Sequence, residues 1–357
     1  MNSTNKPKLI REKIVSFFIP LFSIVIALLL GTILIVVFKK DPISAYKALI
    51  KGSFGNLQAF TNTLSRSTPI IFTSIGAAIA FKCGVFNMGV EGQLNIGGMA
   101  AAIAGYAIPG LPPYIHIPLC ILLGALGGAI WALIPALMKV YRGVHEIIST
   151  IMMNYIAVSL TSYLTATLRD SGVPQTPFIL PSAKMPSMAS LDGFRGSTLN
   201  MGFVIAIMLC FVIYVFLNRT SAGFEIRSVG LNIEASRAAG IKVNKSVITA
   251  MIISGALAGI GGMERVLGVH KAFITGFSPG YGFEGVAASL IASNNPIGAI
   301  FSSVMFGTLA NGGLHMEMSA GVPSQVVSIV QGLIILCVAV NAFFKHIIFK
   351  HKKRREL

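Results

Sequence analysis

The sequence has few charged side chains. Asp, Glu, Lys and Arg together make up 11% of its 357 residues, against about 25% in an ordinary soluble domain. Hydrophobic residues make up 54%, and the mean hydropathy is +0.78. This composition excludes a soluble enzyme. Because a spanning helix needs about 20 residues, the chain can hold about ten spans but no fused catalytic or nucleotide-binding domain of normal size.

Several chemical motifs are also missing. No glycine-rich loop ends in Gly-Lys-Ser or Gly-Lys-Thr, so the sequence lacks the usual ATP-binding loop. The four cysteines are scattered through apolar stretches without paired spacing, and we expect small buried hydrophobic residues rather than disulfides or metal ligands. No carboxylate, His or Cys arrangement has catalytic or metal-ligand spacing. The sequence therefore predicts neither an enzyme nor a protein with its own metal or cofactor.

Acidic residues are fewer than basic residues in this sequence. The chain has 12 Asp and Glu against 28 Lys and Arg, which gives a formal net charge of +16. In polytopic membrane proteins, Lys and Arg gather in cytoplasmic loops and set the orientation. Both ends of the chain are basic, so we expect both in the cytoplasm, with the basic tail touching anionic lipid. Nucleic-acid binding is not expected.

Long apolar runs predict an all-α polytopic membrane protein. Nine runs count as spans, but two cytoplasmic ends require an even number of crossings. We therefore place a short broken helix at 284–293, which brings the prediction to about ten transmembrane segments. The nine other predicted spans are 17–38, 67–81, 94–110, 117–138, 147–168, 200–217, 247–268, 297–311 and 324–344.

The expected organisation has three parts. Residues 1–16 form a basic cytoplasmic N-terminus, residues 17–344 the transmembrane domain and residues 345–357 a basic cytoplasmic tail. Two long connections lie within the transmembrane domain. The external loop 169–199 contains four prolines, which prevent a continuous helix, and the loop 218–245 is expected on the cytoplasmic side.

The centre of the cytoplasmic loop has the signals of a short helix. Asn232 can cap its start, Glu234 suits the positive N-terminal end of a helix, and Gly240 suits the C-terminal turn. Such a helix has about two turns and is marginal alone in water, so it needs a partner or the flanking spans. An amphipathic surface turn explains the same residues equally well.

Polar residues interrupt two apolar segments. Residues 82–98 contain Asn87, Glu91 and five glycines, which predicts a broken helix beside a protein-enclosed cavity. The interrupted segment 276–298 is its counterpart, and such pairs indicate a transport site near mid-membrane. A structural role is the alternative to a pathway role for these side chains. Glu91 could form an ion pair with Lys82 while the amides cap helix ends, and Glu264 could form an ion pair with Arg265. The candidate pathway residues are Phe86, Asn87, Glu91, Gln93, Asn95, Asn154, Glu264, Asn294 and Asn295.

Several stretches resemble one family of membrane proteins. GLNIEASRAAGI (230–241) looks like the cytoplasmic coupling helix of ABC-importer permeases, which sits in a groove of the ATPase subunit. KCGVFNMGVEGQLNIGGMAAA and HEIISTIMMNYIA resemble permeases for branched-chain amino acids, simple sugars and nucleosides. Residues 146–155 and 262–269 are most similar to the nucleoside branch, of the guanosine type.

The resemblance implies a function and a set of partners. The chain would be the permease subunit of an ATP-driven importer of nucleosides in the bacterial plasma membrane, working by alternating access. Its partners would be a second permease subunit, identical or related, two cytoplasmic ATPases that use the ATP, an extracellular substrate-binding lipoprotein and membrane lipids. A simple sugar or another small polar solute is an alternative cargo. An ion-coupled secondary transporter that uses Glu91 and Glu264 is an alternative mechanism. The residues implied in ATPase coupling are Gly230, Asn232, Glu234, Ala235, Arg237 and Gly240.

Overall fold

The computed structural model describes residues 25–169, 172–190, 194, 196–323 and 325–336. The chain forms two compact units: one is Phe54–Thr308, and the other combines Met1–Ser53 with Leu309–Leu357. The described part is built from helices, and its only bridges between extended segments are two isolated ones. The expected all-α class is therefore confirmed.

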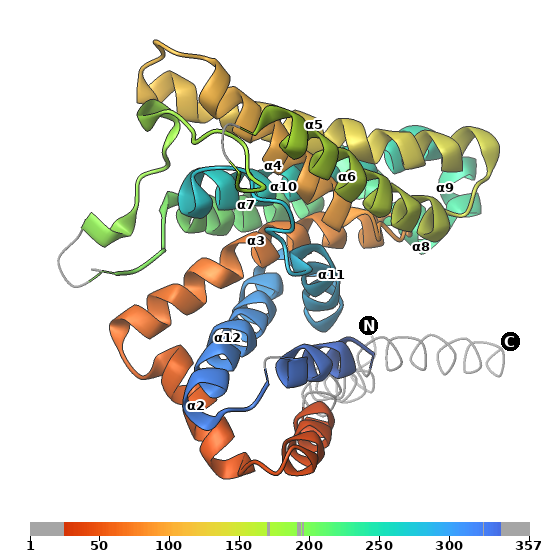
Figure 1. Cartoon of the computed structure of the whole chain (residues 1–357). Helices are drawn as coiled ribbons and strands as arrows, with labels where there is room; N and C mark the ends of the chain where they lie inside the picture. The colour runs from red at the N-terminus through yellow and green to blue at the C-terminus, as the bar shows by residue number, and fades with distance from the viewer. Residues whose placement is uncertain (1–24, 170–171, 191–193, 195, 324, 337–357) are drawn as a thin grey trace, which may run out of the picture. The chain divides into compact units, whose positions relative to one another are not determined.

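The larger unit contains most of the helices (Figure 1). A π-helix, Arg265–His270, continues α10 (Val243–Glu264), and two short 3₁₀ turns, Pro181–Ala183 and Met188–Ser190, lie in the predicted external loop. The helices are α3 (Leu57–Lys82), α4 (Val90–Ala107), α5 (Pro113–Arg142), α6 (Glu146–Leu168), α7 (Met201–Arg219), α8 (Ser221–Leu231), α9 (Ile233–Ala238), α10 (Val243–Glu264), α11 (Tyr281–Ile291) and the first part of α12 (Pro296–Ala320).

Local sequence signals set the helix ends. Asn56 caps α3 by accepting a hydrogen bond from the backbone N–H of Ala59, and Asn200 caps α7 in the same way. At the end of α5, Gly143 has φ of +65°, a left-handed conformation that glycine adopts without strain. These caps satisfy backbone groups that the first and last helical turns leave without partners.

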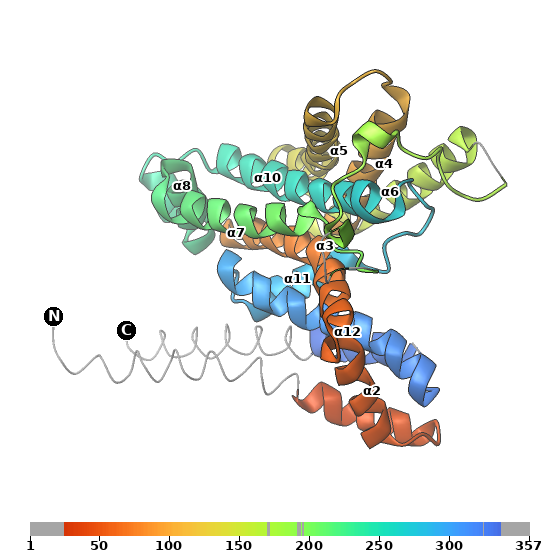
Figure 2. The ribbon, with the colours of Figure 1, turned by 90° about the vertical axis from the view of Figure 1, so that its left-hand side faces the viewer.

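Glycines allow α10 to approach its neighbours closely. α10 lies alongside α3, α4 and α5 in both ribbon views (Figures 1 and 2). A Cβ added to Gly259 would collide with the backbone oxygen of Gly124 on α5, and one added to Gly262 would collide with that of Leu94 on α4. Lipid gives apolar helices little reason to associate, so such small-residue contacts hold a membrane bundle together.

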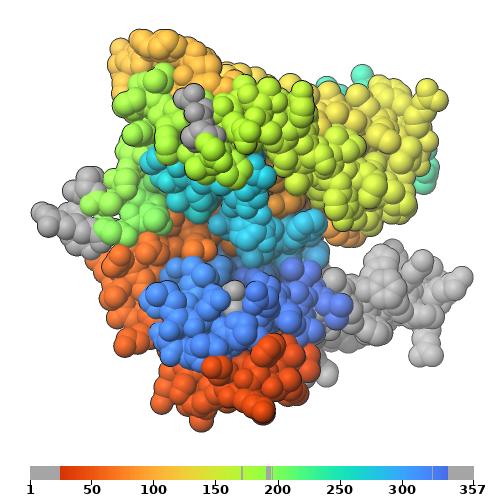
Figure 3. All heavy atoms as spheres, viewed as in Figure 1, coloured from red at the N-terminus to blue at the C-terminus, as the bar shows by residue number. Residues whose placement is uncertain are grey.

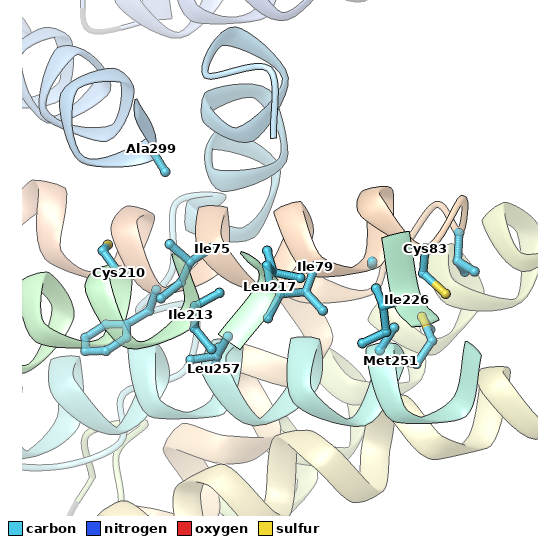
Figure 4. Packing of buried hydrophobic residues seen from close by; sticks show 14 of the residues in the cluster. Ile75, Ile79, Cys83, Cys210, Ile213, Leu217, Ile226, Met251, Leu257 and Ala299 are labelled. Carbon is cyan, nitrogen blue, oxygen red and sulfur yellow. The ribbon is translucent and has the colours of Figure 1, made fainter. Parts of the chain in front are cut away.

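The apolar core of the larger unit lies between α3, α7, α8 and α10. Ile75 of α3, Leu217 of α7 and Met251 of α10 are buried together (Figure 4). Cys83 and Cys210 belong to the same cluster, as expected for cysteines that act as small hydrophobic residues. Burial raises the pKa of the Cys83 thiol, which lies just beyond α3, to about 12, so this thiol stays protonated at neutral pH.

Six helices are long and apolar enough to cross a membrane: α3, α5, α6, α7, α10 with its π-turn, and α12. Predicted spans overlap each of them, although α3 begins ten residues before the predicted 67–81 and α12 continues nine residues past 297–311. The predicted short helix at 284–293 is α11, and the predicted span 94–110 is α4. Neither belongs to the six, so the total of ten remains a prediction.

The smaller unit contains α2 (Pro42–Phe54), the end of α12 and two shorter apolar helices, Val25–Val37 and Gln325–Leu336. Within it, the side-chain amide of Asn311 donates a hydrogen bond of 3.0 Å to the backbone oxygen of Gly52. The two shorter helices cover the described parts of the predicted spans 17–38 and 324–344. The rest of these spans, residues 1–16 and the tail 345–357 lie outside the described residues.

The predicted external loop 169–199 runs alongside the segment that comes after the π-helix and is hydrogen-bonded to it. The backbone N–H groups of Thr176 and Ile179 donate to the carbonyls of Phe273 and Lys271, at 2.9 and 2.8 Å. In Figure 3 the light green of this loop borders the cyan of that segment. Prolines prevent a helix here, and the backbone finds its partners in the neighbouring loop instead.

Candidate functional site

The break between α3 and α4 is confirmed, and buried amides hold it in place. Residues 83–89 are not helical. The side chains of Asn87 and Gln93 exchange two hydrogen bonds of 2.9 and 3.0 Å, and Asn87 also donates to the hydroxyl of Ser254 on α10 at 2.9 Å. Both amides are buried. Their donors and acceptors are thus directed at protein partners, as the helix-capping alternative expects.

Asn154 of α6 ties the same break to a neighbouring helix. Its side-chain amide donates to the backbone oxygen of Met88 at 2.8 Å and accepts from the N–H of Gly92 at 2.8 Å. A single side chain therefore satisfies one free carbonyl in the break and one free N–H in the first turn of α4. Asn95 donates to the backbone oxygen of Glu91 one turn earlier.

Glu91 contacts α11 instead of the expected partner Lys82, which is the last residue of α3. Its Oε2 accepts a hydrogen bond of 2.6 Å from the backbone N–H of Gly282, in the first turn of α11. The alternative of an ion pair with Lys82 is wrong, since no such pair forms between these two described residues. A carboxylate at this place is stabilised by the positive end of the helix dipole. The two interrupted segments of the sequence therefore do meet.

The other expected pathway residues lie apart from this meeting point. Phe86 is exposed, and its ring contacts that of Phe81. Asn294 and Asn295 follow the far end of α11, on the order of 15 Å along the helix axis from Gly282. There, Asn294 accepts a hydrogen bond from Ser289, and Asn295 caps α12 by accepting from the N–H of Ile297.

Glu264 is buried at the end of α10 and has a neutral partner. Its Oε1 accepts a hydrogen bond of 2.7 Å from the side-chain amide of Asn200. The expected ion pair with Arg265 is wrong in the described structure. Arg265 instead donates to the backbone oxygen of Ser65 at 3.4 Å, and its guanidinium lies 5.4 Å from the ring centre of Tyr281.

Glu284 is a buried residue that was not among the predicted pathway residues. It lies in the first turn of α11, and its electrostatic neighbours are Glu91 and Arg66. A carboxylate inside an apolar helix was the available signal, because such residues are costly in a membrane and mark function. The neighbours could not be inferred, since Arg66 and Glu91 are about 200 residues away in the sequence.

Two short helices form the predicted cytoplasmic loop. α9 is the expected short helix: Asn232 caps it by accepting from the N–H of Ala235 at 3.0 Å, and Gly240 ends it with φ of +82°. Glu234 and Arg237 form an exposed pair at 3.4 Å, which contributes little to stability. The preceding helix α8 was not predicted. Thr220 caps α8 by accepting from the N–H of Gly223.

The exposed face of these two helices is apolar in part. Leu231 is 87% exposed, and Phe224 and Ile233 are also exposed. Gly230 faces the other way: a Cβ added to it would collide with the backbone oxygen of Lys82 at the end of α3. α8 is therefore held against a membrane-spanning helix, while its neighbour α9 remains accessible.

Comparison with known proteins gives consistent matches over most of the chain. The family described as branched-chain amino acid transport system / permease component matches residues 59–339. The guanosine ABC transporter permease protein NupP of Bacillus subtilis is 37% identical over 94% of this chain and 97% of its own length. The nucleoside ABC transporter permease protein NupB of Lactococcus lactis is 34% identical over 94% and 93%. The glucose ABC transporter permease protein TsgB13 of Haloferax volcanii is 31% identical over 91% and 88%.

Proposed function

Because the chain belongs to the branched-chain amino acid transport system / permease component family, we propose that it is the membrane-spanning subunit of an ATP-driven ABC importer that carries nucleosides. The observation that carries this proposal is the similarity, over nearly the whole of both chains, to permeases for guanosine and for nucleosides. The six long apolar helices make the chain a multi-pass protein of the bacterial membrane. Its role is transport rather than catalysis.

α8 and α9 are the proposed contact with an ATPase subunit. They are short, they are exposed, and Gly230 packs one of them against the end of α3. A force applied to α9 would therefore pass directly to a membrane-spanning helix. In this proposal Asn232 and Gly240 shape α9, Gly230 transmits its movement, and the exposed Glu234, Ala235 and Arg237 meet the ATPase.

The proposed complex contains a second permease subunit, two ATPase domains and an extracellular binding protein. Both ends of the chain lie in the cytoplasm in this proposal, with about ten membrane segments between them. The absence of an ATP-binding loop in the sequence supports separate ATPases. The break between α3 and α4 and the start of α11 form the polar part of the transport path.

Substrate competition in cells tests the proposed cargo. A strain that depends on this importer should take up labelled guanosine, and a hundredfold excess of other nucleosides should suppress uptake at least tenfold. The same excess of glucose or of a branched-chain amino acid should leave uptake unchanged. Suppression by glucose alone would favour a sugar cargo, which the similarity to a glucose permease makes the second candidate.

A further inference from the structure

A buried carboxylate oxygen of Glu284 has no hydrogen-bond partner. The side chain is 7% exposed, and its Oε2 is one of the few buried polar atoms in the described part without a partner. A buried polar group that lacks a partner costs free energy, and a charged one costs more. Such an atom in a folded protein needs an explanation, and a ligand that binds there is one.

A second buried carboxylate lies beside it. Glu91 is also 7% exposed, and its Oε2 accepts from the N–H of Gly282 at 2.6 Å. A Cβ added to Gly282 would collide with the backbone N of Glu91, so α11 begins directly against α4. Glu91 is the first electrostatic neighbour of Glu284, and Arg66 is the second. Neither glutamate has an ion pair within the described residues.

This carboxylate pair lies beside the middle of a helix long and apolar enough to cross a membrane. The hydroxyl of Thr73 donates to the backbone oxygen of Tyr281 at 2.9 Å, which fixes the start of α11 beside the middle of α3. Thr73 is nine residues from Lys82, roughly 13 Å at 1.5 Å per residue. That is close to half of a hydrocarbon core about 30 Å thick.

We propose that Glu284 and Glu91 bind the two adjacent hydroxyls of the sugar ring of the transported solute. This inference rests on the proposed function, since a ribonucleoside carries such a vicinal diol. A carboxyl group offers acceptor lone pairs whether it is ionised or protonated, and sugar hydroxyls can donate hydrogen bonds to them. The 2′- and 3′-hydroxyls supply two donors, one for the free Oε2 of Glu284 and one for Glu91.

The test compares two substrates in proteoliposomes that contain the whole importer and one binding protein. The substrates are a ribonucleoside and its 2′,3′-dideoxy analogue, and the same binding protein serves every arm, so its preference cancels. Glu284→Gln should lower the uptake rate of the ribonucleoside about tenfold or more and that of the analogue less than twofold. Glu284→Ala, which removes every acceptor from the side chain, should show the same difference between substrates.

Glu264→Gln is the matched control. Glu264 is also buried and also has an oxygen without a partner, but its other oxygen is bound by Asn200. Any loss it causes should be the same for both substrates. Equal losses in the Glu284 variants, or no loss, would overturn the diol site while leaving the importer a nucleoside transporter. If the wild-type importer moved neither substrate, the proposed function itself would be wrong, and the inference would fall with it.

Discussion

Gly230 of α8 lies directly against the backbone oxygen of Lys82, the last residue of α3, at a distance that leaves no room for a Cβ. This contact joins the exposed pair of helices α8 and α9 to a membrane-spanning helix. In the proposed function, it is a direct mechanical link between an ATPase bound at α9 and the membrane-spanning helices.

Gly230→Leu should uncouple transport from ATP hydrolysis. Overpacking of such a contact costs about 1–3 kcal/mol, which moves α8 away from α3 without unfolding the bundle. We expect ATPase activity to persist while nucleoside uptake falls at least tenfold, so that the number of molecules moved per ATP drops. Gly332→Ala is the control, because a Cβ at Gly332 meets nothing within 4 Å. An unchanged ratio in the folded Leu variant would refute the proposed link.

Arg237→Glu should impair the same step from the exposed side. The side chain is 63% exposed and pairs only with Glu234, so the change in unfolding free energy should stay within about 0.5 kcal/mol. We expect weaker binding of the ATPase subunits, measured by co-purification from membranes. Arg169→Glu makes the same charge change at the far end of α6, on the predicted external side, and should leave co-purification intact. Equal behaviour of the two variants would count against α9 as the docking element.

Asn154→Ala should destabilise the break before α4. The substitution removes the partners of two backbone groups, those of Met88 and Gly92, at a cost of about 1–3 kcal/mol for each buried group left unpaired. Asn154→Asp can still accept from Gly92 but cannot donate to Met88, so its melting temperature in detergent should lie between those of the wild type and the Ala variant. Tyr155→Phe, at a position 67% exposed, is the control. A melting temperature unaffected by Asn154→Ala would show that these hydrogen bonds do not hold the break.

Local features of this fold could be predicted from the sequence. Asn232 and Gly240 predicted α9 because capping residues act within a few positions of the helix that they end. The glycines and amides of 82–98 predicted the break after α3 for the same reason. α8 was missed because its sequence, with two glycines and two serines, has weak helix propensity, and its contact with α3 stabilises it.

The arrangement of the buried polar groups could not be predicted. Glu91 and Gly282 are 191 residues apart, and only the packing of α11 against α4 brings them together. The sequence suggested Lys82 as the partner of Glu91 and Arg265 as the partner of Glu264 because each is close by in the chain. In the structure, the backbone N–H of Gly282 is the partner of Glu91, and the side chain of Asn200 is the partner of Glu264. Both partners are far away in the sequence, because the neighbours of a buried group come from whichever helices pack against it.

The proposed orientation of the chain can be checked by labelling single cysteines. Leu231 is 87% exposed beside α9, and Phe178 is 65% exposed in the loop between α6 and α7. A membrane-impermeant maleimide should label Phe178→Cys in intact cells and Leu231→Cys only after the membrane is opened. Both variants are compared with the unsubstituted chain, whose described cysteines are buried. Labelling of Leu231→Cys in intact cells would place α8 and α9 outside and contradict ATPase coupling.

The source of energy for uptake tests the central claim most directly. Labelled guanosine uptake is measured in proteoliposomes that contain this chain and its partner subunits, first with internal ATP and ionophores that collapse every ion gradient, then with gradients and no ATP. An ABC importer should transport at full rate in the first condition and stop in the second. Uptake that follows the ion gradients and ignores ATP would contradict the account.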